Sequence, residues 1–137
     1  MFRRIRIVVT LAAVLILATA SIAAAWTGHD GWRTFDQVNG YTYASDPGTD
    51  KDYSYSDTTR NDEITNTGAK NVYQEYFLYH WDNVSTASDM YSGSSARASQ
   101  WSPTPSTCRN GRFVGDHYAG GTKKGSTTVD PPSDNCP

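Results

Sequence analysis

Aliphatic side chains are scarce in this sequence beyond its first 25 residues. Residues 26–137 contain eight Val, Ile, Leu and Met residues: Val38, Ile64, Val72, Leu78, Val84, Met90, Val114 and Val129. So few aliphatic groups exclude a core built on them alone. The chain has nine Tyr, four Trp and four Phe, and only Phe2 lies before residue 26. We therefore expect aromatic rings to supply most of the buried area, with their hydroxyl and indole N–H groups needing partners or water.

No long hydrophobic run occurs after residue 25. The first 25 residues contain three arginines, an apolar run from Ile7 to Ala18 and a series of small residues that ends in three alanines. This order is typical of a secretory signal peptide, and the run is shorter than the roughly 20 residues of a spanning helix. We expect residues 1–25 to be removed on export. Residues 26–137 would then be a single small β-rich secreted domain without a membrane span.

The sequence also lacks an excess of positive charge. It has 12 basic and 14 acidic residues, and three of the basic ones lie in the first 25 positions. Residues 26–137 therefore carry 9 basic and 14 acidic side chains, a net charge of −5. Strong binding to DNA depends on many Lys and Arg contacts to phosphates, so this balance argues against a DNA-binding protein.

Cysteine is limited to two residues, Cys108 and Cys136. An even number of thiols in an exported chain predicts one disulfide. It would close a loop of about 29 residues and stabilise the fold by roughly 3 to 4 kcal/mol in the chain-entropy model. The bond would pin the Gly-, Ser- and Pro-rich C-terminal tail to the body of the domain.

Sustained helical periodicity is absent, and the one helical expectation is a short turn over residues 96–100. Two strand-like runs flank Asn39-Gly40, a dipeptide that favours a type I′ hairpin turn. A second Asn-Gly, at residues 110–111, predicts another hairpin, with Cys108 and Phe113 on neighbouring strands. The turn-rich segment 45–62 predicts a long loop or an irregular edge hairpin.

The segment 71–81, NVYQEYFLYHW, is dense in residues that favour strands and is apolar on both faces. These properties predict a central strand. The expected fold class is mostly β: a small antiparallel β-sandwich or open barrel with long polar loops and a disulfide-pinned C-terminal tail.

Metal-ligand patterns are weak. Four aspartates in or beside the acidic segment offer the oxygen ligands that calcium prefers: Asp46, Asp50, Asp52 and Asp57. Their spacing does not match an EF-hand loop, so a solvated polar loop without a cofactor is the preferred interpretation, with calcium as the alternative. The three histidines, His29, His80 and His117, show no paired spacing, so no zinc site is expected.

Two short segments raise the question of catalysis. Tyr73-Gln74-Glu75-Tyr76 and Asp116-His117-Tyr118 occur in the order seen in small secreted ribonucleases of the barnase class, which the chain locally resembles. The resemblance implies an acid–base ribonuclease with Glu75 as base and His117 as acid. Arginines such as Arg97 would stabilise charge on the RNA phosphate, but the arginine-rich segment of that family has no counterpart here.

The preferred interpretation is a non-enzymatic extracellular interaction or binding protein, such as an envelope-associated module, an inhibitor or a bacteriocin-like factor. Four aromatic side chains of the strand-like segment offer rigid contact area to a partner: Tyr73, Phe77, Tyr79 and Trp81. The same side chains could instead fill the core. The expected partner is an extracellular protein or a component of the cell envelope, and RNA only under the ribonuclease alternative.

Overall fold

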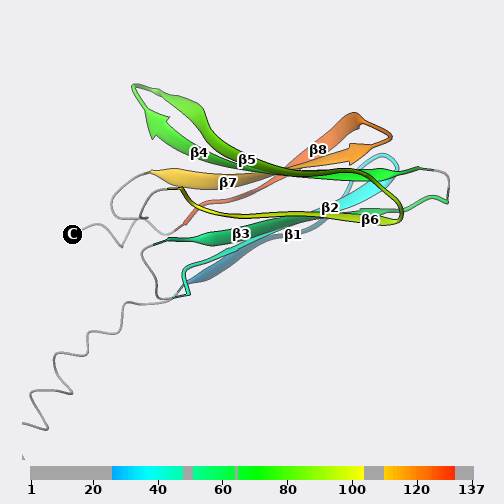
Figure 1. The fold of residues 1–137 in the computed structure, drawn as a ribbon, viewed down its shortest axis with the longest axis horizontal. Helices are drawn as coiled ribbons and strands as arrows, with labels where there is room; N and C mark the ends of the chain where they lie inside the picture. Colours follow the sequence, from blue (N-terminus) through cyan, green and yellow to red (C-terminus); the bar gives the residue numbers. More distant parts are fainter. Residues whose placement is uncertain (1–25, 48–50, 64, 104–109, 132–137) are drawn as a thin grey trace, which may run out of the picture.

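The fold is an all-β sandwich. A computed structural model describes residues 26–47, 51–63, 65–103 and 110–131, whose eight strands form two four-stranded antiparallel sheets packed face to face (Figure 1). The expected sandwich is confirmed and the open barrel is not. The predicted signal peptide, Asp50 and both cysteines lie outside the described residues. Within those residues, no helix is long and apolar enough to cross a membrane.

Each sheet has its own strand order. The first sheet has the order β1, β2, β3, β6, with bounds Thr27–Thr34, Val38–Ser45, Tyr53–Arg60 and Ser95–Trp101. The second sheet has the order β5, β4, β7, β8, with bounds His80–Ser92, Thr67–Phe77, Gly111–Ala119 and Thr122–Val129. The link between β5 and β6 crosses from one sheet to the other in two residues, so these two edge strands lie beside each other.

Strand β3 corrects the prediction of a long loop over residues 45–62. It pairs with β2 on one side and β6 on the other, so it is a central strand. Its side chains alternate strictly: Ser54, Ser56 and Thr58 are buried between the sheets, whereas Tyr53 and Tyr55 face outward and are partly exposed. β3 therefore buries polar side chains and turns aromatic ones outward, the reverse of the usual arrangement. A pattern of inward-facing apolar residues does not predict such a strand.

Asn39-Gly40 does not form a turn, contrary to our prediction. Both residues lie within β2, and the chain reverses before them, at residues 35–38. There Gln37 has a φ of 71°, and the Phe35 N–H donates to the Val38 carbonyl at 2.8 Å. Gly40 serves close packing instead, because a Cβ there would overlap the His117 ring. The second Asn-Gly lies at the start of β7, whose first residue is Gly111, and the expected partner strand through Cys108 lies outside the described residues.

The strand expected over residues 71–81 is central, but it is two strands rather than one. β4 ends at Phe77, Leu78 and Tyr79 form a turn with φ values of 49° and 68°, and β5 begins at His80. The helical turn expected over 96–100 is also wrong, since these residues belong to β6. There the small side chains of Ala96 and Ala98 alternate inward and are buried.

The core contains two small apolar clusters. One contains Ala44, Tyr73, Phe113 and Val129, and the other contains Ala69, Ala96 and Ala98. On β4, Asn71 lies between Ala69 of one cluster and Tyr73 of the other and is completely buried. The centre of the sandwich is therefore polar, and its packing depends on hydrogen bonds as well as on apolar area.

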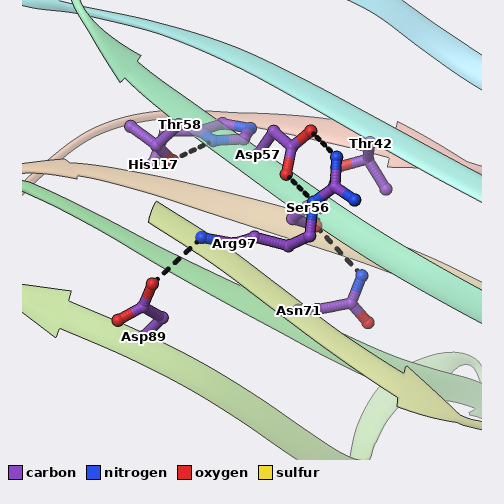
Figure 2. Close-up of polar contacts among 8 residues, drawn as sticks. All are labelled: Thr42, Ser56, Asp57, Thr58, Asn71, Asp89, Arg97 and His117. Atoms are coloured by element: carbon purple, nitrogen blue, oxygen red, sulfur yellow. Dashed lines mark hydrogen bonds and ion pairs between the residues drawn. The ribbon is translucent and has the colours of Figure 1, made fainter. Parts of the chain in front are cut away.

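Two aspartates join the sheets along their edges. Asp89 on β5 accepts the backbone N–H of Arg97 on β6 at 3.1 Å, as Figure 2 shows. On the opposite edge, Asp30 on β1 accepts the backbone N–H of Thr128 on β8 at 3.0 Å. Each contact joins an edge strand of one sheet to an edge strand of the other, so both sides of the sandwich are held by side-chain to backbone bonds.

Candidate functional site

The outer surface of the first sheet carries a continuous set of aromatic rings, which we call the aromatic face. It consists of His29 and Trp32 on β1, Tyr41 and Tyr43 on β2, Tyr53 and Tyr55 on β3, and Trp101 on β6. On β2, β3 and β6 the positions that alternate with these rings are buried or partly buried, so the rings point away from the core. On β1, where the register shifts between Asp30 and Arg33, His29 and Trp32 both stack on Tyr41 and so lie on the same surface. The result is an aromatic cluster at the surface, in which Trp32 and Trp101 are 55% and 51% exposed.

The rings contact one another from one edge of the sheet to the other. Trp32 stacks on Tyr41 with centroids 5.3 Å apart, and Tyr43 stacks on Tyr55 at 5.0 Å. Contacts of 6.1 Å between Tyr41 and Tyr55, of 6.4 Å between Tyr55 and Tyr53 and of 5.1 Å between Tyr53 and Trp101 complete the path. The sheet backbone fixes these spacings, so the surface is a rigid, ordered platform rather than a set of independent side chains.

Charge on the aromatic face is internally balanced. Arg97 lies over the Tyr55 ring, 4.1 Å from its centroid, and makes two bonds to Asp57, of 2.6 and 2.7 Å (Figure 2). The bonds to Asp57 raise the pKa of Arg97 above its ordinary value. Near the opposite edge, Arg33 pairs with Asp30 at 3.0 Å. The arginine that lies over the rings, Arg97, is therefore neutralised by an aspartate. Arg33, which pairs with the inward-facing Gly40, is neutralised by Asp30 on the other side of β1.

Tyr41 of the aromatic face keeps a neutral hydroxyl. Burial and, to a smaller extent, the neighbouring Tyr55 raise the pKa of Tyr41 above its ordinary value. A neutral phenol can both donate and accept a hydrogen bond at the rim of its ring. This part of the aromatic face thus combines apolar ring surfaces with a polar group.

The four aromatic side chains predicted to bind a partner are separated by the structure. Tyr73 is 2% exposed and packs on Phe113 in the core. Phe77 and Tyr79 lie at the tip of the β4–β5 hairpin and are 63% and 93% exposed. Trp81 lies behind the tip. Its ring contacts that of Tyr76 in a tilted arrangement, and the guanidinium of Arg112 lies 3.9 Å from its ring centroid.

His117 lies between the two sheets and is fully buried. It belongs to a chain of seven hydrogen-bonded polar side chains that spans the core: Ser54, Asn71, Ser56, Thr42, Thr127, His117 and Thr58. His117 Nε2 lies 2.7 Å from Thr127 Oγ1, and Nδ1 lies 2.7 Å from Thr58 Oγ1. Figure 2 shows the Thr58 end of this chain beside the Ser56 and Asn71 contact.

One direction of donation satisfies the chain. The Asn71 amide donates to both Ser54 and Ser56, because its oxygen accepts from Gln100. Each following hydroxyl then donates its single proton in a hydrogen bond to the next group. Ser56 donates to Thr42, Thr42 donates to Thr127, and Thr127 donates to His117 Nε2. His117 Nδ1–H donates to Thr58, so His117 is a neutral imidazole with its proton on Nδ1.

Burial favours the same protonation state. Desolvation lowers the pKa of His117 from 6.5 to about 4, although the carboxylate of Asp116 acts in the opposite direction. A protonated ring would have to donate through both nitrogens, which reverses the direction of the hydroxyl chain. His117 is therefore a structural hydrogen-bonding group at neutral pH.

The structure does not bring Glu75, His117 and Arg97 together. On β4, Glu75 pairs with Gly111 and Ala69 pairs with His117, so Glu75 and His117 are six strand positions apart. At about 3.3 Å per residue, this separation is roughly 20 Å. Arg97 lies on the outer surface of the other sheet. A base and an acid must reach one substrate, and this arrangement does not allow it.

The aspartates considered for calcium are also dispersed. Asp46 and Asp52 are buried near the ends of β2 and β3, whereas Asp57 is on the aromatic face beside Arg97. Among the residues that the structure describes, no group of three or more His, Cys, Asp or Glu side chains is placed to hold a metal ion. Asp50 lies outside those residues.

The sequence analysis missed the aromatic face, although a signal for it exists. The segments Tyr41-Thr42-Tyr43 and Tyr53-Ser54-Tyr55 both alternate aromatic and hydroxyl residues with a period of two. Two such strands side by side predict a ring-covered surface backed by hydroxyl groups. No protein-family model, curated protein or solved structure matches this chain.

Proposed function

We propose that this protein is a non-enzymatic extracellular binding protein whose aromatic face holds an uncharged glycan of a cell envelope or matrix. The observation that carries the proposal is the continuous path of ring contacts from Trp32 to Trp101 across four strands. The export signal expected in residues 1–25 is consistent with such a location. Determination of the N-terminus of the mature protein checks that expectation.

The chemistry of the aromatic face favours sugar rings. The electron-rich face of a Tyr or Trp ring attracts the polarised C–H groups on the flat side of a pyranose. Tyrosine hydroxyls and indole N–H groups at the ring edges can then bond to sugar hydroxyls. A rigid row of rings matches a repeating polymer, because successive units can stack on successive rings without reordering the protein.

Charge argues against a polyanionic ligand at the same surface. Single-stranded nucleic acid also stacks on aromatic platforms, but such platforms lie in positively charged grooves. Here Arg97 and Arg33 are each paired with an aspartate. Among the described residues, the arginine that lies over the rings is already neutralised by Asp57, which favours a neutral ligand over RNA.

Binding to insoluble polysaccharide tests the proposal. The purified protein should be depleted from solution by cellulose or chitin, and Trp32→Ala or Trp101→Ala should weaken binding about tenfold each, since stacked rings dominate such contacts. Tyr91→Asn serves as the control, because Tyr91 is an exposed aromatic residue on the other sheet. Binding should persist at high salt.

Other outcomes would contradict the proposal. Loss of RNA integrity that depends on both Glu75 and His117 would establish the ribonuclease alternative instead. Salt-sensitive retention on single-stranded RNA would indicate a polyanion ligand. Retention on envelope fractions only before protease treatment would indicate a protein partner, provided that Trp32→Ala and Trp101→Ala still abolish it.

A further inference from the structure

The tip of the β4–β5 hairpin is an exposed apolar projection on the sheet that does not carry the aromatic face. Phe77, Leu78 and Tyr79 are 63%, 68% and 93% exposed. In Figure 1 this end of the hairpin curves away from the other sheet, so the tip is convex and stands clear of the sandwich. We infer that the tip inserts into the surface of a phospholipid bilayer and holds the protein there.

The backbone of the tip is strained in a way that stability does not explain. Leu78 and Tyr79 both have positive φ, as a type I′ turn requires. Asn-Gly adopts this turn without the steric clash of a bulky side chain. Replacing Leu78 and Tyr79 by Asn-Gly would also uncover no part of the core, because the side chains of Leu78 and Tyr79 are exposed to solvent. Gln37 and Tyr91 are single exposed residues with positive φ, whereas Leu78 and Tyr79 are consecutive. The tip therefore concentrates strain and exposed apolar area at one place, which supports a role for the side chains themselves.

The base of the hairpin holds the tip rigidly. The ring of Trp81 contacts the ring of Tyr76 in a tilted arrangement. The guanidinium of Arg112 lies over the Trp81 ring and donates a hydrogen bond to Gln74 at 2.7 Å. Gln74 in turn donates to Asn83 on the partner strand, also at 2.7 Å. The tip therefore keeps its shape when free, and insertion needs no ordering of a flexible loop.

The hairpin also satisfies polar groups that insertion would remove from water. His80 Nδ1 lies 3.0 Å from the Leu78 carbonyl at the turn, and His80 Nε2 lies 3.0 Å from Asp82. A turn carbonyl without a partner is costly in an apolar medium. His80 thus covers the backbone group that lies nearest to the apex.

The order of side chains along the hairpin matches the layers of a bilayer surface. Phe77 and Leu78 at the apex suit the acyl boundary, whereas the rings of Tyr76 and Trp81 behind them suit the headgroup level. Arg112 over Trp81 can place its guanidinium among phosphates. The four residues from Tyr76 to Tyr79 carry no charge, so an uncharged lipid surface suffices for insertion.

The size of the tip disfavours a protein partner. Three side chains of this kind bury on the order of 500 Å². A stable protein interface, including one with a second copy of this chain, buries about 800 Å² on each partner. A bilayer has no such requirement, because lipid adapts its shape to the inserted groups.

Vesicle binding by the exported protein tests the inference, with phosphatidylcholine vesicles as the probe and a second set containing phosphatidylglycerol. The decisive variant is Leu78→Asn with Tyr79→Gly, which installs the favoured turn sequence. It should lose vesicle binding by about tenfold or more, since it removes two apolar side chains. The same variant should melt at a higher temperature than the parent protein, because the strain is relieved.

Tyr91→Asn is the matched control. Tyr91 is also exposed and has a positive φ of 60°, but it lies at the opposite end of β5. This change should relieve strain without altering vesicle binding. All three proteins are recovered after export and their N-termini determined, because the apolar segment within residues 1–25 would itself bind vesicles and mask a difference at the tip.

Three results would overturn the inference. The parent protein could fail to bind either set of vesicles, the tip variant could bind as well as the parent, or binding could require phosphatidylglycerol and disappear with salt. Retention on protease-sensitive cell material without vesicle binding would indicate a protein pocket for the tip. Because these vesicles contain no glycan, the outcome is independent of polysaccharide binding by the aromatic face.

Discussion

The hydroxyl of Thr42 lies 2.6 Å from the hydroxyl of Thr127, across the space between the two sheets and 85 positions away in the chain. This contact joins the Asn71 end of the buried polar chain to His117. Removing either hydroxyl breaks the series of hydrogen bonds at this point. The first prediction follows from that interruption.

Thr127→Val should lower the free energy of unfolding by about 1 to 3 kcal/mol, because Thr42 loses an acceptor and His117 Nε2 loses a donor inside the core. Thr128→Val, a change of the same kind at the less buried neighbouring position, is the control and should be nearly neutral. Urea titration measures both. Thr42→Val should lower the free energy of unfolding less in the Thr127→Val background than in the parent protein, because both changes remove the same hydrogen bond.

Stability should fall as the pH falls from 6.5 to 4. In the unfolded chain His117 takes up a proton below its ordinary pKa of 6.5, whereas the folded state resists protonation down to about 4. The unfolded state therefore binds more protons in this window, and acidification favours it. The loss is on the order of 3 kcal/mol across the window and is absent above pH 6.5.

His117→Gln is the variant that isolates this effect. An amide keeps a donor and an acceptor but does not titrate, so the pH dependence between 6.5 and 4 should flatten even if the overall stability is lower. His29→Gln, at an exposed position, should retain the parent slope. Unfolding curves at a series of pH values measure both, and equal slopes for all three proteins would contradict the assignment.

Gly115→Ala should destabilise the protein by about 1 to 3 kcal/mol or more through overpacking. A Cβ at position 115 would overlap the side-chain oxygens of Thr42 and Ser56, so the two sheets would have to separate there. Gly31→Ala on β1 is the control, because a Cβ there meets open space. Thermal melts should show a large decrease for the first variant only.

Cys108 and Cys136 should be joined in protein recovered from an oxidising compartment. Peptide mapping without reductant should yield the linked pair, and reduction should lower the melting temperature by several degrees, since the closed loop restricts the unfolded chain. Two alkylatable thiols in the native exported protein would refute the disulfide.

The sequence was sufficient to predict a mostly β fold, with a sandwich as one of two architectures, and a central strand that includes residues 71–77, because strand-favouring residues and the absence of helical periodicity are local properties. It was not sufficient to divide residues 71–81 into two strands. Leu78 and Tyr79 adopt a turn that neither side chain favours, and only pairing of β4 with β5 imposes it.

Two other incorrect predictions, the turn at Asn39-Gly40 and the loop over residues 45–62, concern residues whose conformation depends on contacts between the two sheets. Asn39-Gly40 has the composition of a turn, but Gly40 lies opposite the His117 ring, and that contact depends on how the sheets pack. Residues 45–62 predict a loop because the segment is rich in turn-forming and acidic residues. The hydroxyl residues of β3 are nevertheless buried, because Asn71 and His117 of the other sheet supply hydrogen-bond partners, which no local pattern reveals.

The contacts of Asp30 and Asp89 at the two sides of the sandwich bear on self-association. Edge strands expose N–H groups that can pair with another molecule and seed aggregation. Here the N–H of Thr128 on edge strand β8 and that of Arg97 on edge strand β6 are already occupied by carboxylates. An incoming strand would have to displace a charged acceptor at either edge, so these two aspartates protect a serine-rich, weakly apolar protein from sheet extension.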